Sequence, residues 1–246
     1  MRRLAAALMF MLLSAAAKPQ TDDFRHGLSH WRVEAEAPSR VSVEGGVMDI
    51  DAPEGLSIWW SEALRGPVAI EYEVMAVSAG GPNDEVSDVN AFWMATDPAA
   101  PDGSPLTRPR SGAFAAYDTL RTYYVGIGGN RNTTTRMRRY VGEPGNRPLL
   151  PEHDRSDAAA LLVANRWVPV RLSADGTTVT VDLGGKRLFT MTDTAPYRRG
   201  WFALRTTRSH LRIRNFRIVP LGGQAARMGT QRRGDAEKFS GAAAPE

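Results

Sequence analysis

The sequence predicts an all-β fold, a sandwich or jelly roll of two antiparallel sheets. Many short segments alternate apolar and polar residues with the two-residue period of a half-buried strand. Glycine turns such as Asp175-Gly176 and Gly184-Gly185 separate these segments at short intervals. A helical pattern appears only weakly, around residues 157–165. Short strands at regular spacing, with few helices between them, are typical of β-sandwiches.

The expected strands follow one another along nearly the whole chain. In the first half, the alternating segments are residues 31–35, 41–43, 46–51, 58–60, 68–77 and 89–95. The last of these is a compact apolar strand with one amide, Asn90, inside it. In the second half, residues 167–172, 177–182 and 186–191 form an expected meander, and residues 200–205 and 210–218 close the domain.

One further expected hairpin, residues 121–140, has three tyrosines, two asparagines and five arginines around a glycine turn, and no carboxylate. Because side chains alternate along a strand, Tyr124 and Gly126 share one face, while Arg136, Arg138 and Tyr140 share one face of the return strand. We expect this surface on the concave face of the sandwich. Guanidinium groups bind carboxylates bidentately and aromatic rings stack on sugars, so a uronate-containing saccharide fits both. The alternative is a solvated face whose arginines pair with acids elsewhere in the fold.

The two ends of the chain differ from its middle. Arg2 and Arg3 precede the apolar run 4–13, and small residues follow at 15–17, which is the layout of a signal peptide. We therefore expect residues 1–17 to be removed on export, leaving a periplasmic or secreted protein without a membrane span. Residues 18–220 are expected to form one domain, because no linker interrupts them. Residues 221–246 have almost no large apolar side chain and are expected to be a disordered tail.

Residue types that are absent or scattered limit the possible chemistry. The chain has no cysteine, which excludes disulfides, thiolate metal sites and cysteine nucleophiles. The four histidines show no metal-ligand spacing, so we expect no metal and no cofactor. A structural calcium ion in the acidic loop 84–88 is the alternative that remains open. Export and the scarcity of lysine in the hairpin argue against nucleic acid as the partner.

The ends of the domain and its central hairpin resemble known proteins. Asp22-Asp23-Phe24 with Trp31, residues 200–205 and residues 209–216 resemble the first and last strands of concanavalin A-like jelly rolls. The motif YYVGIGGNRNTTTRMRRY (123–140), with Asn90-Ala91-Phe92-Trp93, is similar to a family of secreted bacterial domains of unknown function in that lectin and glucanase superfamily. The resemblance implies a concanavalin A-like jelly-roll sandwich and a role in polysaccharide breakdown. It supplies no established catalytic residues.

The chemistry of a polysaccharide lyase suggests roles for individual residues. β-Elimination beside a uronate needs a cation or amide for the carboxylate, a base for the C5 proton and an acid for the leaving oxygen. The expected catalytic residues are Tyr124, Arg136, His153 and Tyr140, and the expected substrate-binding residues are Asn90, Trp93, Arg121, Asn130 and Arg138.

Hydrolysis is less favoured, because a glycosidase needs two carboxyls that flank the scissile bond. The nearest acidic group, Asp84-Glu85-Val86-Ser87-Asp88, does not alternate onto one face. We therefore expect an exported monomer that degrades an acidic polysaccharide or oligosaccharide, such as a pectic one, with a lyase favoured over a hydrolase. The main alternative is a non-catalytic carbohydrate-binding module that uses the same face. In a structural or adhesion domain, the charge of the hairpin would have no role.

Overall fold

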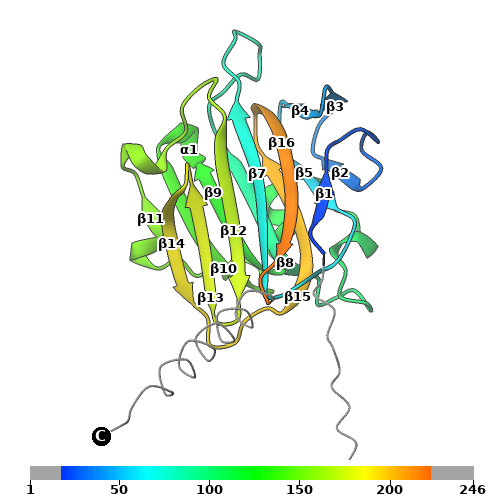
Figure 1. The fold of residues 1–246 in the computed structure, drawn as a ribbon, viewed down its shortest axis with the longest axis vertical. Helices are drawn as coiled ribbons and strands as arrows, with labels where there is room; N and C mark the ends of the chain where they lie inside the picture. The colour runs from blue at the N-terminus through cyan, green and yellow to red at the C-terminus, as the bar shows by residue number, and fades with distance from the viewer. Residues whose placement is uncertain (1–17, 223–246) are drawn as a thin grey trace, which may run out of the picture.

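The computed structural model describes residues 18–222, which form two stacked β-sheets (Figure 1). Each sheet contains eight strands, and the paired strands are antiparallel. The predicted all-β jelly-roll sandwich is therefore confirmed. The predicted signal peptide and most of the predicted tail lie outside the described residues.

Sheet A has the strand order β14-β13-β12-β7-β16-β4-β3, and β1 is added beside β16. Its strands are β1 (Gln20–Asp22), β3 (Arg40–Glu44), β4 (Val47–Ala52), β7 (Val68–Ala76), β12 (Val168–Asp175), β13 (Thr178–Leu183), β14 (Lys186–Thr192) and β16 (Ser209–Pro220). Figure 1 shows β12, β7 and β16 side by side, with the first strand β1 next to the last strand β16. The first and last strands of the domain thus pair with each other.

Sheet B has the strand order β11-β10-β9-β8-β15-β5-β2, and β6 pairs with β15. Its strands are β2 (Trp31–Ala35), β5 (Leu56–Trp60), β6 (Leu64–Arg65), β8 (Val89–Thr96), β9 (Arg121–Gly128), β10 (Thr134–Val141), β11 (Asp154–Arg155) and β15 (Arg199–Thr206). The expected strands all form. The strands β1, β6 and β11 have only two or three residues, too few for an alternating pattern to show in the sequence.

The main core lies between the sheets. Alternate side chains of β9 point into this core and to the outer face of sheet B. Tyr123, Val125 and Ile127 point inward and are completely buried in this core. Burial of an apolar side chain of this size stabilises the fold by roughly 1.5–3 kcal/mol. The intervening Tyr124 points to the outer face of sheet B.

The outer face of sheet B carries a second apolar cluster, which includes Trp59, Phe92, Tyr124 and Tyr140. The segment between β8 and β9 covers part of it with two short 3₁₀ helices, η1 (Pro105–Thr107) and η2 (Phe114–Tyr117). This face is therefore partly closed by a loop and partly open, and the open part contains the candidate site.

The helical elements are short. The β9–β10 hairpin turns through α1 (Gly129–Asn132), where Asn130 and Arg131 adopt left-handed φ angles of 53° and 59°. The weak helical pattern around residues 157–165 yields only one 3₁₀ turn, η4 (Ala158–Ala160), and η3 (Pro151–His153) precedes β11. Within residues 18–222, no helix is long and apolar enough to cross a membrane.

Candidate functional site

A groove of about 500 Å³ opens on the outer face of sheet B beside the β9–β10 hairpin. The strands contribute Asn90, Tyr124, Gly126, Arg136 and Arg138, and the loop before β8 contributes Glu85, Ser87 and Asp88. The hairpin tip contributes Gly129, Asn130 and Arg131, the start of β10 contributes Thr134, and other loops contribute Phe114, Arg147, Thr207 and Arg208. Three strands, the hairpin tip and four other loops thus surround one space.

The strand register brings the polar side chains together. Tyr124 lies directly opposite Arg138, and Gly126 lies opposite Arg136 on one side and Asn90 on the other. Residues directly opposite each other in antiparallel strands project from the same face. Tyr124 and Arg136 therefore share one face of sheet B, as the alternation predicts.

Gly126 forms the floor of the groove. A methyl group at this position would lie 2.7 Å from the hydroxyl of Tyr124 and 3.1 Å from Oδ1 of Asn90. The absence of a side chain therefore lets a phenol and an amide oxygen approach the same point. The Asn90 side chain is 3 % exposed, and its Oδ1 is buried without a hydrogen-bond partner. A buried acceptor of this kind is costly to leave unpaired, so it favours a ligand that donates a hydrogen bond.

Five arginines line the walls of the groove. Three of its arginines have carboxylate partners: Arg131 with Glu85 at 3.4 Å, Arg136 with Asp154 at 2.9 Å, and Arg147 with Asp118 at 3.4 Å. Among residues 18–222, no carboxylate pairs with Arg138 or Arg208, and Arg138 donates to the backbone oxygen of Arg147 at 2.7 Å. The cationic charge of the groove is thus only partly neutralised.

Aromatic rings support the groove from below and at one end. The Tyr124 ring lies 5.4 Å from that of Tyr140 and 5.7 Å from that of Phe114, and the Arg147 guanidinium lies 5.1 Å from the Phe114 ring centre. Burial raises the pKa of Tyr124, and it raises that of Tyr140 to about 12 although the nearby Arg147 lowers it. Both phenols therefore keep their protons near neutral pH.

A buried arginine holds the loop that supplies Phe114. Arg205 of β15 is 2 % exposed and lies opposite Asn90 in the sheet. Its Nη1 donates to the backbone oxygen of Gly112 at 2.7 Å and to Ser57 at 3.2 Å, while its guanidinium lies 5.1 Å from the rings of Phe114 and Tyr117. Burial lowers the pKa of Arg205. These contacts fix η2 against sheet B and thereby set one end of the groove.

A larger depression, of about 1490 Å³, lies on the outer face of sheet A. Its arginines are matched by acids of the neighbouring strands: Arg171 and Arg217 with Glu71, and Arg214 with Glu73 at 2.6 Å. Paired surface charges of this kind stabilise by little and leave few groups for a ligand. We therefore place the candidate site in the smaller groove on sheet B. Residues 18–222 hold no cluster of three or more His, Cys, Asp or Glu side chains that could bind a metal ion.

A family model described as a domain of unknown function, DUF6250, matches residues 50–216, more than half of the chain. The chain belongs to the DUF6250 family. This match confirms the predicted membership of a family of unknown function. No curated protein matches the chain in sequence.

Solved structures share the fold of this DUF6250 domain. A Bacillus subtilis protein of unknown function with a galectin-like fold is 12 % identical, with a TM-score of 0.61, over 83 % of this chain and 96 % of that one. The carbohydrate-binding module CBM66 from the same organism is 10 % identical, with a TM-score of 0.50, over 77 % and 95 %. The carbohydrate recognition domain of Emp46p is 12 % identical, with a TM-score of 0.52, over 80 % and 90 %. At these identities the likeness shows a common fold.

Five of the nine predicted site residues line the groove of the DUF6250 domain: Asn90, Tyr124, Asn130, Arg136 and Arg138. They come from β8, from β9 and β10, and from the hairpin tip. Asn130 lies at that tip, where its Nδ2 donates to Oγ1 of Thr134 at 3.1 Å. A predicted sixth residue, Tyr140, is completely buried beneath the groove, where its ring lies 5.4 Å from the Tyr124 ring and 5.9 Å from the Arg147 guanidinium.

The other three predicted residues lie elsewhere. Trp93 is completely buried between the sheets, and its Nε1 donates to the Ser173 oxygen at 3.2 Å. Arg121 is exposed at the start of β9, and its position in the strand alternates with that of Tyr124, so it faces the other way. His153 is 1 % exposed, and its Nε2 lies 3.1 Å from the Thr190 oxygen of β14. The geometry therefore separates all three from the groove.

The five arginines of the hairpin do not form one surface. Arg131, Arg136 and Arg138 line the groove, whereas Arg139 contacts Asp193 at 2.8 Å on the other face of β10. Three of the five arginines, Arg131, Arg136 and Arg139, pair with acids from other segments. The alternative interpretation, in which the hairpin arginines pair with acids elsewhere in the fold, thus holds for these three arginines. The cationic surface of the hairpin is smaller than predicted.

Several groove residues escaped the sequence-based prediction. Phe114, Arg147 and Arg208 come from loops far from the hairpin in sequence, and no local pattern places them beside it. The residues of the acidic loop before β8 separate in the structure: Glu85 and Asp88 line the groove, while Asp84 contacts His210 at 2.9 Å on the side of sheet A.

Proposed function

We propose that the groove binds an acidic carbohydrate through the carboxylate of a uronate. The observation that supports this most is the pair of unmatched arginines, Arg138 and Arg208, in a groove whose buried Asn90 oxygen also lacks a partner. A planar guanidinium binds a carboxylate with two parallel hydrogen bonds, while an amide oxygen accepts from a sugar hydroxyl. A uronate carries both groups on one ring.

The remaining groups of the groove fit a sugar better than a simple anion. The rings of Phe114 and Tyr124 offer apolar surface beside the polar groups, and Gly126 leaves room above the sheet. Ligand sites usually combine apolar walls with a few oriented polar groups in this way. The shared fold with CBM66 and the Emp46p carbohydrate recognition domain supports a carbohydrate ligand.

We further propose that the protein is a lyase that cleaves this carbohydrate by β-elimination. Arg138 and Arg136 would stabilise the charge that develops on the uronate carboxylate. The Tyr124 hydroxyl, kept protonated by burial, would protonate the leaving oxygen. The signal-peptide pattern supports action in the periplasm or outside the cell on a polymer such as pectin, with the protein working as a monomer.

One assay tests this proposal. The purified protein is incubated with a panel of uronate polysaccharides, while absorbance of unsaturated products and release of reducing ends are both recorded. A lyase raises both signals together, because each elimination creates one double bond and one new chain end. Reducing ends without absorbance would show hydrolysis. Binding without either signal would identify a carbohydrate-binding module, the alternative that the folds of CBM66 and Emp46p support.

A further inference from the structure

Asp88 has an unusual backbone at the edge of the groove. It ends the loop between β7 and β8 and adopts a left-handed φ of 56°, while its backbone nitrogen donates to the Gly128 oxygen at 3.2 Å. Such a conformation is uncommon for a residue with a side chain, although aspartate and asparagine tolerate it better than most. Non-glycine residues of this kind often occur at functional sites.

The Asp88 carboxylate is oriented by two hydrogen bonds and is not neutralised. Ser87 Oγ donates to Oδ2 at 2.6 Å, and Asn90 Nδ2 donates to Oδ1 at 3.2 Å. In the part of the chain that the structure describes, no arginine, lysine or histidine forms an ion pair with it, whereas Glu85 on the same wall pairs with Arg131. An ionised carboxylate has about four lone-pair sites, so each oxygen of Asp88 still has a lone pair that can accept a hydrogen bond or a proton from a ligand.

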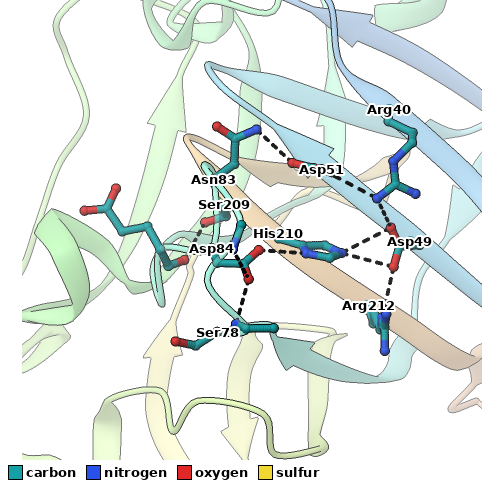
Figure 2. A network of polar contacts seen from close by, with 12 residues as sticks. Arg40, Asp49, Asp51, Ser78, Asn83, Asp84, Ser209, His210 and Arg212 are labelled. Carbon is teal, nitrogen blue, oxygen red and sulfur yellow. Dashed lines mark hydrogen bonds and ion pairs between the residues drawn. The ribbon is translucent and has the colours of Figure 1, made fainter.

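The loop that carries Asp88 is fixed from the side of sheet A. Figure 2 shows His210 of β16 between Asp84 of this loop, at 2.9 Å, and Asp49 of β4, at 3.1 Å. Next to His210, Ser209 Oγ donates to the backbone oxygen of Ser87 at 2.6 Å. The loop that carries Asp88 is thus also held by contacts outside the groove, and a positioned group of this kind needs little reorganisation when substrate binds.

We propose that Asp88 is the catalytic base of the groove, a role that rests on the lyase function proposed above. The carboxylate takes the C5 proton, the C–H electron pair forms the C4–C5 double bond, and the C4–O4 bond breaks. The departing oxygen receives its proton from the Tyr124 hydroxyl. Asp88 and Tyr124 return to their starting states by exchanging protons with water, so no oxidant or other co-reactant is needed.

This assignment replaces the base that the sequence suggested. His153, the last residue of η3, is buried against β14 and does not line the groove. Asp88 faces the same space as Tyr124, and its charge is close enough to raise the pKa of Tyr124 further, after the larger effect of burial. The two groups that a β-elimination needs, a proton acceptor and a proton donor, therefore line the same groove.

The test is Asp88→Asn, since asparagine tolerates the left-handed backbone and keeps similar hydrogen bonds. We expect kcat on a uronate polysaccharide to fall about 10²–10⁴-fold, while Kd for a uronate oligosaccharide, measured by calorimetry, does not rise. Asp175→Asn, an exposed residue at a turn of sheet A, removes the same charge elsewhere and serves as the control. A kcat within tenfold of the unmodified protein would overturn the role of Asp88.

A second variant separates catalysis from structure. Asp88→Gly suits the φ of 56° and leaves a space where the carboxylate lay. Added formate should restore part of the lost turnover, and no restoration would count against a carboxylate base. If the unmodified protein binds the uronate oligosaccharide but cleaves no uronate polymer, the Asp88 assignment fails while carbohydrate binding stands. If it does not bind, both the proposed function and the assignment fail.

Discussion

Tyr124 and Arg138 lie directly opposite each other on β9 and β10, so a phenol and a guanidinium without a carboxylate partner enter the same groove. Both side chains are set by the alternation of a regular antiparallel pair rather than by a loop. Sites built on such elements hold their geometry more firmly than sites on loops. The pair is therefore a natural starting point for testing the proposed binding and cleavage.

Tyr124→Phe tests the proton donor. The change keeps the ring and removes one hydroxyl, so a protein that only binds should lose at most about 0.5–1.5 kcal/mol of affinity. If the hydroxyl is the acid, kcat should fall about 10²–10⁴-fold with little change in Kd. Tyr140→Phe is the matched comparison, because Tyr140 is buried beneath the groove. Steady-state kinetics and calorimetry check both, and undiminished turnover in Tyr124→Phe contradicts the assignment.

Arg138→Lys tests the recognition of a carboxylate. Lysine keeps the positive charge but loses the planar fork that forms two parallel hydrogen bonds. We expect both binding and turnover to weaken, and by more than in Arg136→Lys, because Asp154 already occupies one side of the Arg136 guanidinium. Arg25→Lys, in an exposed loop on the side of sheet A, is the control. Equal affinities for all three variants would exclude bidentate recognition by Arg138.

Gly126→Ala tests the groove floor. The new methyl group would lie 2.7 Å from the Tyr124 hydroxyl, so the Tyr124 side chain must shift and part of the floor is filled. A single methyl group of misfit in a binding pocket changes affinity by about 10–200-fold, and we expect a loss in this range with little loss of thermal stability. Gly222→Ala adds the same group where the nearest atom is 3.9 Å away and should change neither. Unchanged binding in Gly126→Ala would place the ligand elsewhere.

The buried tyrosines predict a loss of stability at alkaline pH. Burial raises the pKa of Tyr140 to about 12, and it also raises those of Tyr72, Tyr117 and Tyr123 above the value of about 10 for an unfolded chain. The unfolded state then releases protons first, so the stabilisation is complete below pH 10 and is lost as the pH rises toward 12. The free energy of unfolding from denaturant titrations should fall over this range, and less steeply in Tyr140→Phe. A constant value would contradict burial of these phenols.

The strands and the centre of the site could be predicted because both follow from alternation. Two-residue periodicity places Asn90, Tyr124, Arg136 and Arg138 on the face of sheet B without knowledge of the rest of the fold. The same alternation would have excluded Arg121, because it lies an odd number of positions from Tyr124.

The site residues that could not be predicted lie in loops. The places of Asp88 and Arg147 depend on how residues 77–88 and 142–150 return to sheet B, and such paths are set by distant contacts such as Asp84 with His210. His153 is a loop residue that was predicted to lie in the site but lies outside it. A histidine between acids resembles a surface group, but here η3 turns it between the sheets, where its Nδ1 has no hydrogen-bond partner.

The binding of an acidic carbohydrate is tested most directly by titrating the protein with a uronate oligosaccharide and with a neutral glucan oligosaccharide of equal length, each at low and high salt. Salt screens exposed charges over about 8 Å at physiological ionic strength and about 3 Å at 1 M. We predict that the uronate binds more tightly than the neutral sugar and that its affinity falls as salt rises. Equal affinity for both sugars, unaffected by salt, would contradict recognition of a carboxylate by the groove arginines.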